Sequence, residues 1–573
     1  MTMDKKSILN SIKTRTDEIR KVYKTLPPER VLVVWSLLTL SVLSIFTALL
    51  IINNRHMITV PTLGGIVAEG IVGIPRFINP VLATSEQDSD LTELVFAGLT
   101  KRDKNSSIIL DMAQSVEESE DRLHYDVVIK PNSYFHDGTA VTADDIIYTI
   151  SLIQNASIKS PYRVKWEGVT VEKKSAKEII FSLKKPYPLF MNALTIGILP
   201  KHVWKNLPDE QISLSDYNIN AIGSGPFYID KIISDSGIPK TIILKEYKDY
   251  TLGRPYINEL DITTYQNEKY LIQAFKNGEI TRIHGISIDK ALSLGVATNT
   301  IKTSLLPRTI TVFFNPNKAD FLSDKKVRQA LNMAIDKKEI LNDVLKGYGK
   351  IIDTPYPFDD DQGESVYDVD KAKALLATSK YIKNASSTLT INLSTVNTDE
   401  MKKIAEIIKN DWAKIGVTTN ISVYEISDLN QSIIKERDFQ TLLFGTITES
   451  PSDLYAFWHS SQREYPGLNI SNYVSNKLDK QLEILRDSDN ELDRISAYEA
   501  VKKEFVDEIP GIFIFTPSMI YINNDKTVSV LPDASLNNSS RFSLIPLWYK
   551  NTERIWPKTY YKTLITKLDS IIH

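Results

Sequence analysis

The sequence predicts an α/β fold with at least two lobes, preceded by one membrane-spanning helix. Patterns typical of strands and of helices alternate along most of the chain, which favours α/β layers over a β-sandwich or a helix bundle. The chain has 573 residues, too many for one ordinary domain, and its 42% hydrophobic and 24% charged content is typical of folded protein. The third observation is a long apolar run near the start, residues 31–52.

This run contains no charged residue, and as a helix it is long enough to cross the roughly 30 Å hydrocarbon layer of a membrane. Lys and Arg outnumber Asp and Glu in residues 1–30, whereas Arg55 is the only Lys or Arg shortly after the run. That bias predicts a single-pass protein of the cell membrane with its N-terminus in the cytoplasm and the rest outside. The alternatives are a cleaved secretory signal, although no A-x-A-like site follows, and a buried core helix.

The composition argues against several classes of function. The net charge is −3 and no basic patch with interleaved aromatics stands out, so we do not expect a nucleic-acid partner. The absence of cysteine excludes disulfides, thiolate metal sites, a Cys nucleophile and a lipid-modified N-terminal Cys. No G-x-S-x-G, H-E-x-x-H or Walker motif is present. An enzyme is not excluded, but none of these patterns calls for one, and we expect no metal and no cofactor.

Two local units have strong patterns. Residues 268–277 should form a helix that Gly278 ends. Hydrophobic alternation in residues 388–395 and 417–424 predicts two strands that flank a helix from Met401 to Ile415. This is a β-α-β element, whose strands should be parallel and whose crossover should be right-handed.

The segment FHDGTAVTADDIIYTI, residues 135–150, combines a turn and a capped helix. His136, Asp137 and Gly138 have the composition of a tight turn, and Gly can take positive φ. Thr142 can then cap a helix whose third residue, Asp145, reaches back toward the cap. His136 and Asp137 have the atoms to bind a metal, but no second ligand pair supports a metal site, so a turn-stabilising role is favoured.

A second segment, VRQALNMAIDKKEI at residues 327–340, predicts a pair of helices. The first helix packs through Val327 and Leu331, among others. Asp336 then caps the second helix through a D-x-x-E pattern with Glu339, and Gly347 ends it.

Together the two segments resemble the family of large extracytoplasmic substrate-binding proteins, family 5, that serve peptide, nickel and oligosaccharide ABC importers. The resemblance extends from about Gly64 to about Trp548. Further segments match in the order in which the family has them: residues 94–99, 183–187, 198–202, 223–227, 367–376 and 508–510.

The resemblance implies a two-lobed fold of the large type II periplasmic-binding-protein kind, with an extra subdomain, that closes on a ligand by hinge motion. It also implies that His136, Asp137 and Arg328 hold turns and lobes together rather than touch ligand. The expected organisation is a cytoplasmic segment at 1–30, the anchor at 31–52, a linker at 53–63, lobe I at 64–306 with its subdomain at about 101–221, lobe II at 307–509, and a return to lobe I with a tail at 510–573.

In peptide-binding members of the family, a carboxylate just after a strand of lobe II pairs with the amino terminus of the peptide. The main chain of that strand pairs with the peptide like an added strand. Counting from Gly445 places Glu449 at the amine-binding position, and Asp453 is an acidic alternative nearby. Without a ligand role, Asp453 would cap the helix 454–459 and Glu449 would be solvated.

Four further residues are expected near the ligand. Thr446 stands where the family frequently has Trp, a departure that bears on peptide specificity. Tyr455 and Trp458 could supply an aromatic wall, although aromatics at this spacing also occur in cores. Asn315 follows the strand 311–314, where family members place residues at the cleft.

We therefore expect a membrane-anchored, extracytoplasmic solute-binding protein that captures peptides between two lobes for an ABC importer. Its partners would be the peptide or another small solute, the permease subunits, and the lipid bilayer through residues 31–52. The alternatives are the same fold binding a nickel chelate, haem or an oligosaccharide, and an extracellular sensor or enzyme that reuses the fold.

Overall fold

The computed structural model describes residues 16, 20, 25, 27–187, 190–359, 367–382, 389–488 and 490–557. Most of the cytoplasmic segment expected at residues 1–30 lies outside these residues, as does most of the C-terminal tail. The chain forms two compact units, one made of Met1–Thr62 with Asn551–His573 and the other of Leu63–Lys550.

The smaller unit is built around one long helix, α2 (Pro28–His56), with Pro28 in its first turn. Its segment Pro28–Asn53 is apolar and long enough to cross a membrane, and its most apolar stretch is not buried. This exposure argues against the buried-core alternative for residues 31–52. After the helix, β1 (Ile58–Thr62) pairs antiparallel with β20 (Asn551–Ile555), so the last described strand returns to the exit of the helix.

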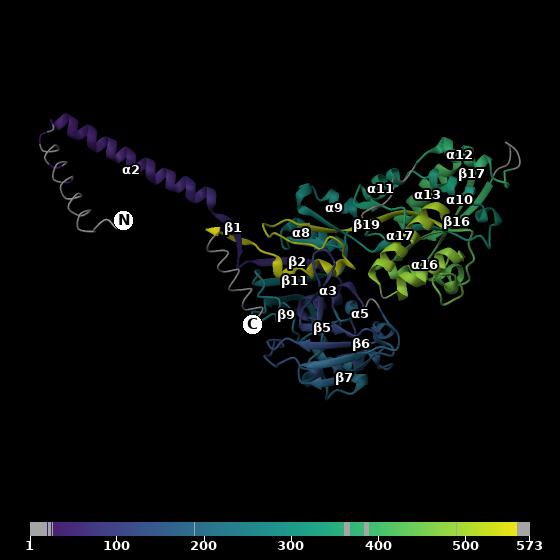
Figure 1. The fold of residues 1–573 in the computed structure, drawn as a ribbon, viewed down its shortest axis with the longest axis horizontal. Coiled ribbons are helices and arrows are strands. Elements are labelled where there is room, and N and C mark those ends of the chain that lie inside the picture. The colour runs from purple at the N-terminus through teal and green to yellow at the C-terminus, as the bar shows by residue number, and fades with distance from the viewer. Residues whose placement is uncertain are drawn as a thin grey trace, which may run out of the picture. The chain divides into compact units, whose positions relative to one another are not determined.

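The larger unit contains twelve connected strands in two halves that share β19 (Gly511–Asn523), visible in Figure 1. We call them the first and the second half-sheet. The first half-sheet contains β2 (Ile66–Val72), β9 (Phe227–Asp235), β10 (Ile238–Glu246), β11 (Glu259–Tyr265), β12 (Arg282–His284) and β13 (Ile301–Leu305). The second half-sheet contains β14 (Arg308–Phe314), β15 (Gly349–Ile351), β16 (Leu389–Val396), β17 (Val417–Tyr424) and β18 (Thr441–Ile447).

Strand β19 joins the halves because its two ends have different partners. Its first residues pair with β14 and β15, and its last residues pair with β13 and β12. The chain therefore passes between the half-sheets twice, once between β13 and β14 and once within β19. The expected lobe boundaries near residues 307 and 510 stay predictions.

Two small sheets lie within the range expected for the subdomain, 101–221, or at its edge. One pairs β3 (Thr100–Arg102) with β4 (Ile108–Leu110), and the other has the order β5-β6-β8-β7. The latter strands are β5 (Ala113–Glu118), β6 (His124–Ile129), β7 (Thr170–Ser175) and β8 (Glu178–Ser182).

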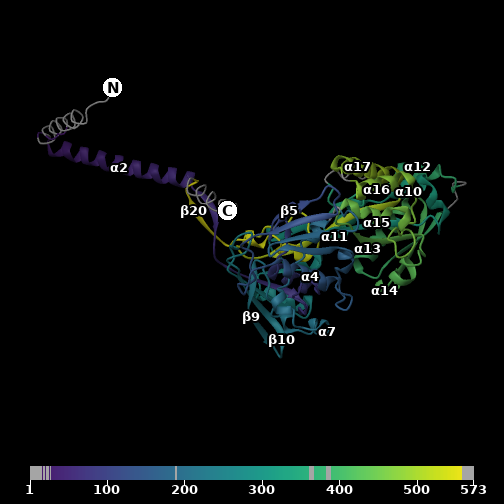
Figure 2. The ribbon, with the colours of Figure 1, turned by 60° about the horizontal axis from the view of Figure 1, so that its bottom comes forward.

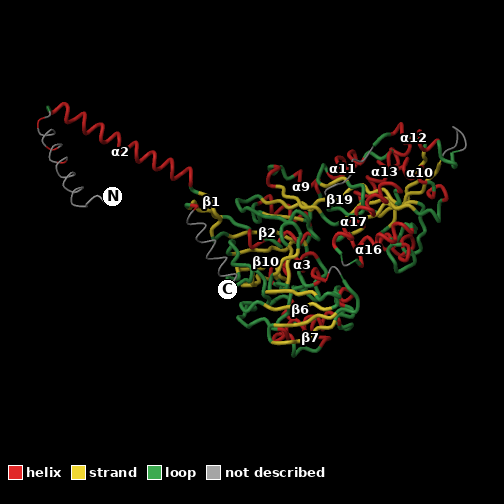
Figure 3. Tube along the Cα trace, viewed as in Figure 1, coloured by secondary structure: helices red, strands yellow, loops and turns green. Residues whose placement is uncertain are grey.

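Helices surround these sheets, as the colouring of Figure 3 shows. Those before β14 are α3 (Glu86–Val95), α4 (Ala143–Gln154), η1 (Arg163–Trp166), α5 (Phe190–Ala193), α6 (Lys201–Trp204), α7 (Asp209–Ile212), η2 (Asp216–Asn218), α8 (Glu268–Asn277), α9 (Ile288–Ser293) and η3 (Thr298–Thr300).

The helices after β14 include α16 and α17, which lie side by side in Figures 1 and 2. They are η4 (Asp320–Ser323), α10 (Lys325–Met333), α11 (Lys337–Leu345), α12 (Val369–Ala377), α13 (Asp399–Lys414), α14 (Ile426–Asp428), η5 (Leu429–Ile434), η6 (Pro451–Asp453), α15 (Leu454–Trp458), η7 (Ser460–Gln462), α16 (Asn476–Asp487), α17 (Glu491–Glu508), η8 (Asn538–Phe542) and η9 (Ile545–Leu547).

The strongest local predictions are confirmed. Strands β16 and β17 are parallel, with Leu389 opposite Val417, and α13 connects them. Helix α8 ends at Gly278, whose φ is 75°. The indole of Trp412 in α13 donates to Leu331 O at 3.0 Å, so the β-α-β unit and α10 form one core.

The residues that identify the family hold segments together, as expected. In the turn before α4, His136 donates from Nε2 to Gly225 O at 3.1 Å and accepts at Nδ1 from Gly223 N at 3.3 Å. A Cβ at Gly223 would lie 2.0 Å from Val95 O, so only glycine lets this loop pack on the end of α3. Arg328 donates to two carbonyls at the end of α17, one of them that of Glu508, and to a further carbonyl before α10. It thus connects these two segments.

The segment after β19 is fixed to the first half-sheet by a buried charge network, which we call the Arg541 network. Arg541 in η8 donates to both carboxylate oxygens of Asp90 in α3, at 2.8 and 2.7 Å, and to Glu69 in β2 at 2.8 Å. Tyr521 of β19 donates to the other oxygen of Glu69 at 2.6 Å. His284 in β12 lies 3.3 Å from Asp90. Each buried charge is therefore paired, which is what makes its burial tolerable.

We expect Asp145→Ala to lower the free energy of unfolding by about 2–3 kcal/mol, because it leaves buried backbone donors unsatisfied. Asp145 accepts from Thr142 N at 2.8 Å, as predicted for the cap, and from Lys201 N at 2.8 Å. Urea unfolding followed by Trp fluorescence measures the change. Asp144→Ala, in the same helical turn but half-exposed, is the matched control, and equal losses for the two variants would contradict this role.

We also expect stability to fall by roughly 2–3 kcal/mol between about pH 6.5 and pH 9, because His284 is bound as a cation. Burial and Arg541 lower the pKa of His284, but Asp90 and Glu86 more than offset them and raise it from 6.5 to about 9. The pKa of His284 is higher in the folded than in the unfolded protein. Its contribution to stability is therefore complete below the unfolded pKa and is lost as the pH rises through the folded pKa. Unfolding measured from pH 6 to 10 should show this decline in the native protein and a flatter profile in His284→Gln; parallel profiles would refute it.

Candidate functional site

A cavity of about 480 Å³ lies in the larger unit, and both halves of the chain line it. Most of its wall comes from α3, β3, η1 and η8, together with loops on the side of the first half-sheet. We call the parts of the larger unit around the first and the second half-sheet its first and second half. The end of β18 and the turn after it contribute the other side through Ile447, Glu449 and Asp453. A volume of this size lies within the range of small-ligand sites.

The turn after β18 is built to present Glu449. Asp453, the last residue of η6, accepts from Glu449 N and Ser450 N at 2.9 Å each, so its carboxylate closes the turn. Burial raises the pKa of Asp453, an effect that the two backbone donors oppose. The carboxylate of Glu449 has no hydrogen bond or ion pair to any residue that the structure describes. Of the two candidate acids, Asp453 therefore shapes the loop, and Glu449 is the one whose carboxylate has no partner among the described residues.

Two cations of the first half influence these two acids. Arg102 of β3 donates to Ser106 O at 3.0 Å. Burial lowers the pKa of Arg102, and the nearby charge of Glu449 opposes this shift. The positive charge of Lys165 in η1 favours the ionised form of Asp453 and so lowers the pKa of that acid. Charges of opposite sign thus face one another from the two halves.

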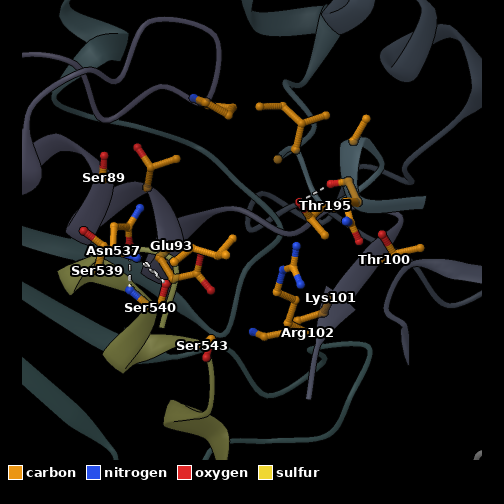
Figure 4. A pocket seen from close by; sticks show the side chains of 18 of the residues that line it. Ser89, Glu93, Thr100, Lys101, Arg102, Thr195, Asn537, Ser539, Ser540 and Ser543 are labelled. Atoms are coloured by element: carbon orange, nitrogen blue, oxygen red, sulfur yellow. Dashed lines mark hydrogen bonds between the residues drawn. The ribbon is translucent and has the colours of Figure 1, made fainter. Parts of the chain in front are cut away.

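The inner wall holds a second group of charges. Tyr250 donates to Asp111 at 2.8 Å, Thr251 also donates to Asp111, and Lys101 donates to Tyr250 Oη at 3.2 Å. Burial raises the pKa of Asp111 and of Glu93 in α3, while Lys101 lowers both. Figure 4 shows part of the cavity wall. Glu93 lies on the side of Ser89, Asn537, Ser539 and Ser540, and Lys101 and Arg102 lie toward Thr100 and Thr195.

Strand β18 has an open edge that leads to this turn. On one side it pairs with β14 over its whole length, from Thr441 to Ile447. On the other side β16 pairs only with residues 441–443. In the described parts of the chain no strand pairs with this second edge at residues 444–447. The main chain just before Glu449 therefore offers unused strand hydrogen-bonding groups.

The other four predicted site residues do not line this cavity. Asn315 is buried, and its amide donates to Arg437 O at 2.8 Å, so it stabilises a turn. Thr446 lies in β18 opposite Thr309. Tyr455 stacks on His459, with ring centroids 4.2 Å apart. Trp458 is 2% exposed and packs on Phe313 and other core aromatics, which matches the core alternative for this residue.

Five charged residues of the first half were not predicted from the sequence, namely Glu93, Lys101, Arg102, Asp111 and Lys165. Glu93 directly precedes the segment 94–99 that carries part of the family resemblance, and Lys101 and Arg102 follow that segment. The family resemblance therefore pointed to this part of the chain, but nothing in the local sequence pattern indicated which side chains face a cavity.

The family of the chain follows from its similarity to known proteins. Residues 107–465 match the family described as bacterial extracellular solute-binding proteins, family 5 Middle. The chain belongs to this family. Its fold is that of the periplasmic binding proteins, as the resemblance implied, and proteins of this family serve ABC importers as solute-binding components rather than as enzymes.

The relatives bind different ligands. The oligopeptide-binding protein AppA of Bacillus subtilis is 28% identical over 479 residues, which cover 80% of this chain and 87% of AppA. The AppA structure in complex with a nonapeptide has a TM-score of 0.61 at 26% identity and covers 86% of this chain and 100% of AppA. NikZ from Campylobacter jejuni in complex with Ni(L-His) has a TM-score of 0.63 at 26% identity, covering 85% and 99%. CtaP from Listeria monocytogenes, an ABC transporter substrate-binding protein, has a TM-score of 0.71 at 26% identity, covering 85% and 100%.

Proposed function

We propose that this protein is a membrane-anchored, extracytoplasmic receptor that captures peptides for an ABC importer. The observation that carries the proposal is the open edge of β18 followed by the unpaired carboxylate of Glu449. A peptide main chain can pair with the open edge, and its terminal ammonium can then bind Glu449. Because these contacts use groups that all peptides share, they tolerate many side chains.

The cavity chemistry supports a peptide over the other ligands considered. Arg102 and Lys165 provide positive charge for a carboxylate, and the wall also presents aromatic rings from Tyr162, Trp166 and Tyr187. No histidine lies among the described residues that line the cavity, although histidine is a frequent ligand for nickel. The similarity to AppA, which is named for binding oligopeptides, points the same way.

Capture would use the two passages between the half-sheets as a hinge. Both passages contain a proline, Pro307 between β13 and β14 and Pro517 within β19. They are tied together, since Leu306 N donates to Pro517 O at 3.0 Å and Thr516 Oγ1 donates to Leu306 O at 2.6 Å. Two adjacent strand connections permit rotation of one half against the other while limiting its direction. Closure would bring Glu449 and Arg102 to opposite sides of the ligand.

The anchor in this proposal is α2. Its most apolar stretch is not buried, and the Lys and Arg bias favours a cytoplasmic N-terminus. At the other end of the helix, His56 stacks on Trp556 with ring centroids 6.5 Å apart. An indole at the end of an apolar helix is typical of the membrane interface.

We expect Glu449→Gln to weaken binding of free-amine tripeptides by about tenfold or more, and of N-acetylated tripeptides little, because only the former lose an ionic hydrogen bond. Isothermal titration calorimetry on the purified protein measures both affinities. Asp453→Asn should weaken both classes, since it loosens the turn itself. Glu491→Gln, at an exposed position of α17, controls for net charge. Equal losses in Glu449→Gln for the two classes would count against the amine role.

The ligand class has a direct test in the native protein. Mass spectrometry of small molecules released when the purified protein is denatured should recover mixed short peptides. A single nickel chelate, haem or oligosaccharide species would replace the peptide proposal with that ligand.

For the anchor, we expect the full-length chain to stay in the membrane pellet after alkaline carbonate extraction. External protease should digest the residues after α2 in intact spheroplasts. Release of the full-length chain into the soluble fraction, or a mature chain that begins after residue 57, would replace the anchor with a peripheral protein or a cleaved signal.

A further inference from the structure

Glu93 is a cavity-lining acid that the peptide scheme above does not use. It lies near the end of α3, four residues after Ser89, so the two share a face of the helix. Figure 4 shows Glu93 among the labelled residues around the pocket, on the side of Asn537, Ser539 and Ser540. It has no hydrogen bond or ion pair to any residue in the described part of the chain.

The acids of the cavity wall outnumber its basic residues. Its wall contains four acids and three basic residues: Glu93, Asp111, Glu449 and Asp453 against Lys101, Arg102 and Lys165. Arg102 opposes Glu449, and Lys165 opposes Asp453. Lys101 acts on both of the other acids, and Lys130, which is not part of the wall, also acts on Asp111.

Lys101 is held on the side of Asp111. Its ammonium donates to Tyr250 Oη and lies 5.5 Å from the centroid of the Tyr250 ring, and Tyr250 in turn donates to Asp111. Lys101 also acts on Glu93, but Asp111 and Asp90 act on Glu93 in the opposite sense. Asp111 thus accepts hydrogen bonds from Tyr250 and Thr251, whereas the carboxylate of Glu93 has no such partner among the described residues.

A carboxylate without a hydrogen-bond partner in a partly dehydrated wall is costly unless a cation binds it. Burial raises the pKa of Glu93, which reflects this cost. Nearby oxygens can share in binding a cation, since Ser539, Ser540 and Asn537 carry hydroxyl or amide acceptors. The ring of Phe96, one turn further along the chain, offers an apolar surface for an alkyl stem.

We propose that Glu93 forms a side-chain subsite for a cationic group, so that the preferred ligands are short peptides that carry Lys or Arg. This inference rests on the proposed function and narrows its substrate class. Glu449 would bind the terminal ammonium, the edge of β18 the main chain, and Glu93 the side-chain cation. The cavity volume of about 480 Å³ suits a peptide of a few residues rather than a long chain.

The test compares tripeptides that differ only in side-chain charge. Ala-Lys-Ala, Ala-Met-Ala and Ala-Glu-Ala are titrated into the full-length protein in detergent, followed by the same three side chains at the third position. At one of the two positions Lys should be preferred over Met by about tenfold to a hundredfold, the range expected for a charged hydrogen bond in a cavity. Glu should bind more weakly than Met.

The variant Glu93→Gln should reduce the preference for Lys over Met to near unity while it leaves the affinity for Ala-Met-Ala within about threefold. Retained Ala-Met-Ala binding also shows that the variant is folded. Glu117→Gln, which removes an exposed acid from β5, is the matched control and should keep the full preference.

The outcomes separate the two proposals. If no tripeptide binds the native protein, the peptide receptor itself is refuted. If tripeptides bind but Lys and Met bind equally, Lys101 already neutralises Glu93, and the cationic subsite is refuted alone. A Lys preference that survives in Glu93→Gln would likewise overturn the assignment to Glu93.

Discussion

The shared strand β19 is the constraint on which the rest of the structure depends. Its 13 residues are almost all buried, and its two ends are hydrogen-bonded into different half-sheets, so neither half-sheet is complete without it. At the passage between the halves, Pro517 lies opposite Gly349, where an added Cβ would come within 2.7 Å of Thr516 O. The close packing here fixes how the halves are connected. The Arg541 network then holds the far end of β19 through Tyr521 and Glu69.

This connection explains why the cavity is made of residues so distant in sequence. The halves meet beside β19, so the end of β18 in one half faces α3 and β3 in the other. Among the described residues, Glu449 forms no ion pair within its own half, and Arg102 forms none within the other half. A ligand that carries both signs of charge can satisfy both halves at once. Binding and closure are then favoured by the same contacts.

Local structure was largely predictable from the sequence, and the site only in part. The cap at Thr142 and Asp145, the β-α-β unit and the end of α8 at Gly278 depend on neighbours in sequence, and each is confirmed. Family resemblance also led to Glu449. It could not separate the roles of Glu449 and Asp453, because that requires knowing which backbone donors the Asp453 carboxylate accepts. Glu93 and Arg102 were missed because their environment comes from residues hundreds of positions away.

The contrast between Glu449 and Glu93 shows how one cavity can combine tolerance with preference. Contacts to the main chain and the terminal ammonium are common to all peptides and therefore do not discriminate among sequences. Discrimination needs a group that meets a side chain, and it is strongest where that group is buried and otherwise unpaired. Glu449 is positioned by the turn that Asp453 closes, at the end of an open strand edge. Glu93 is positioned by a helix that the Arg541 network fixes through Asp90, on a rigid wall away from that edge. In the proposed receptor, the first arrangement would accept peptides as a class, and the second would select among them by charge.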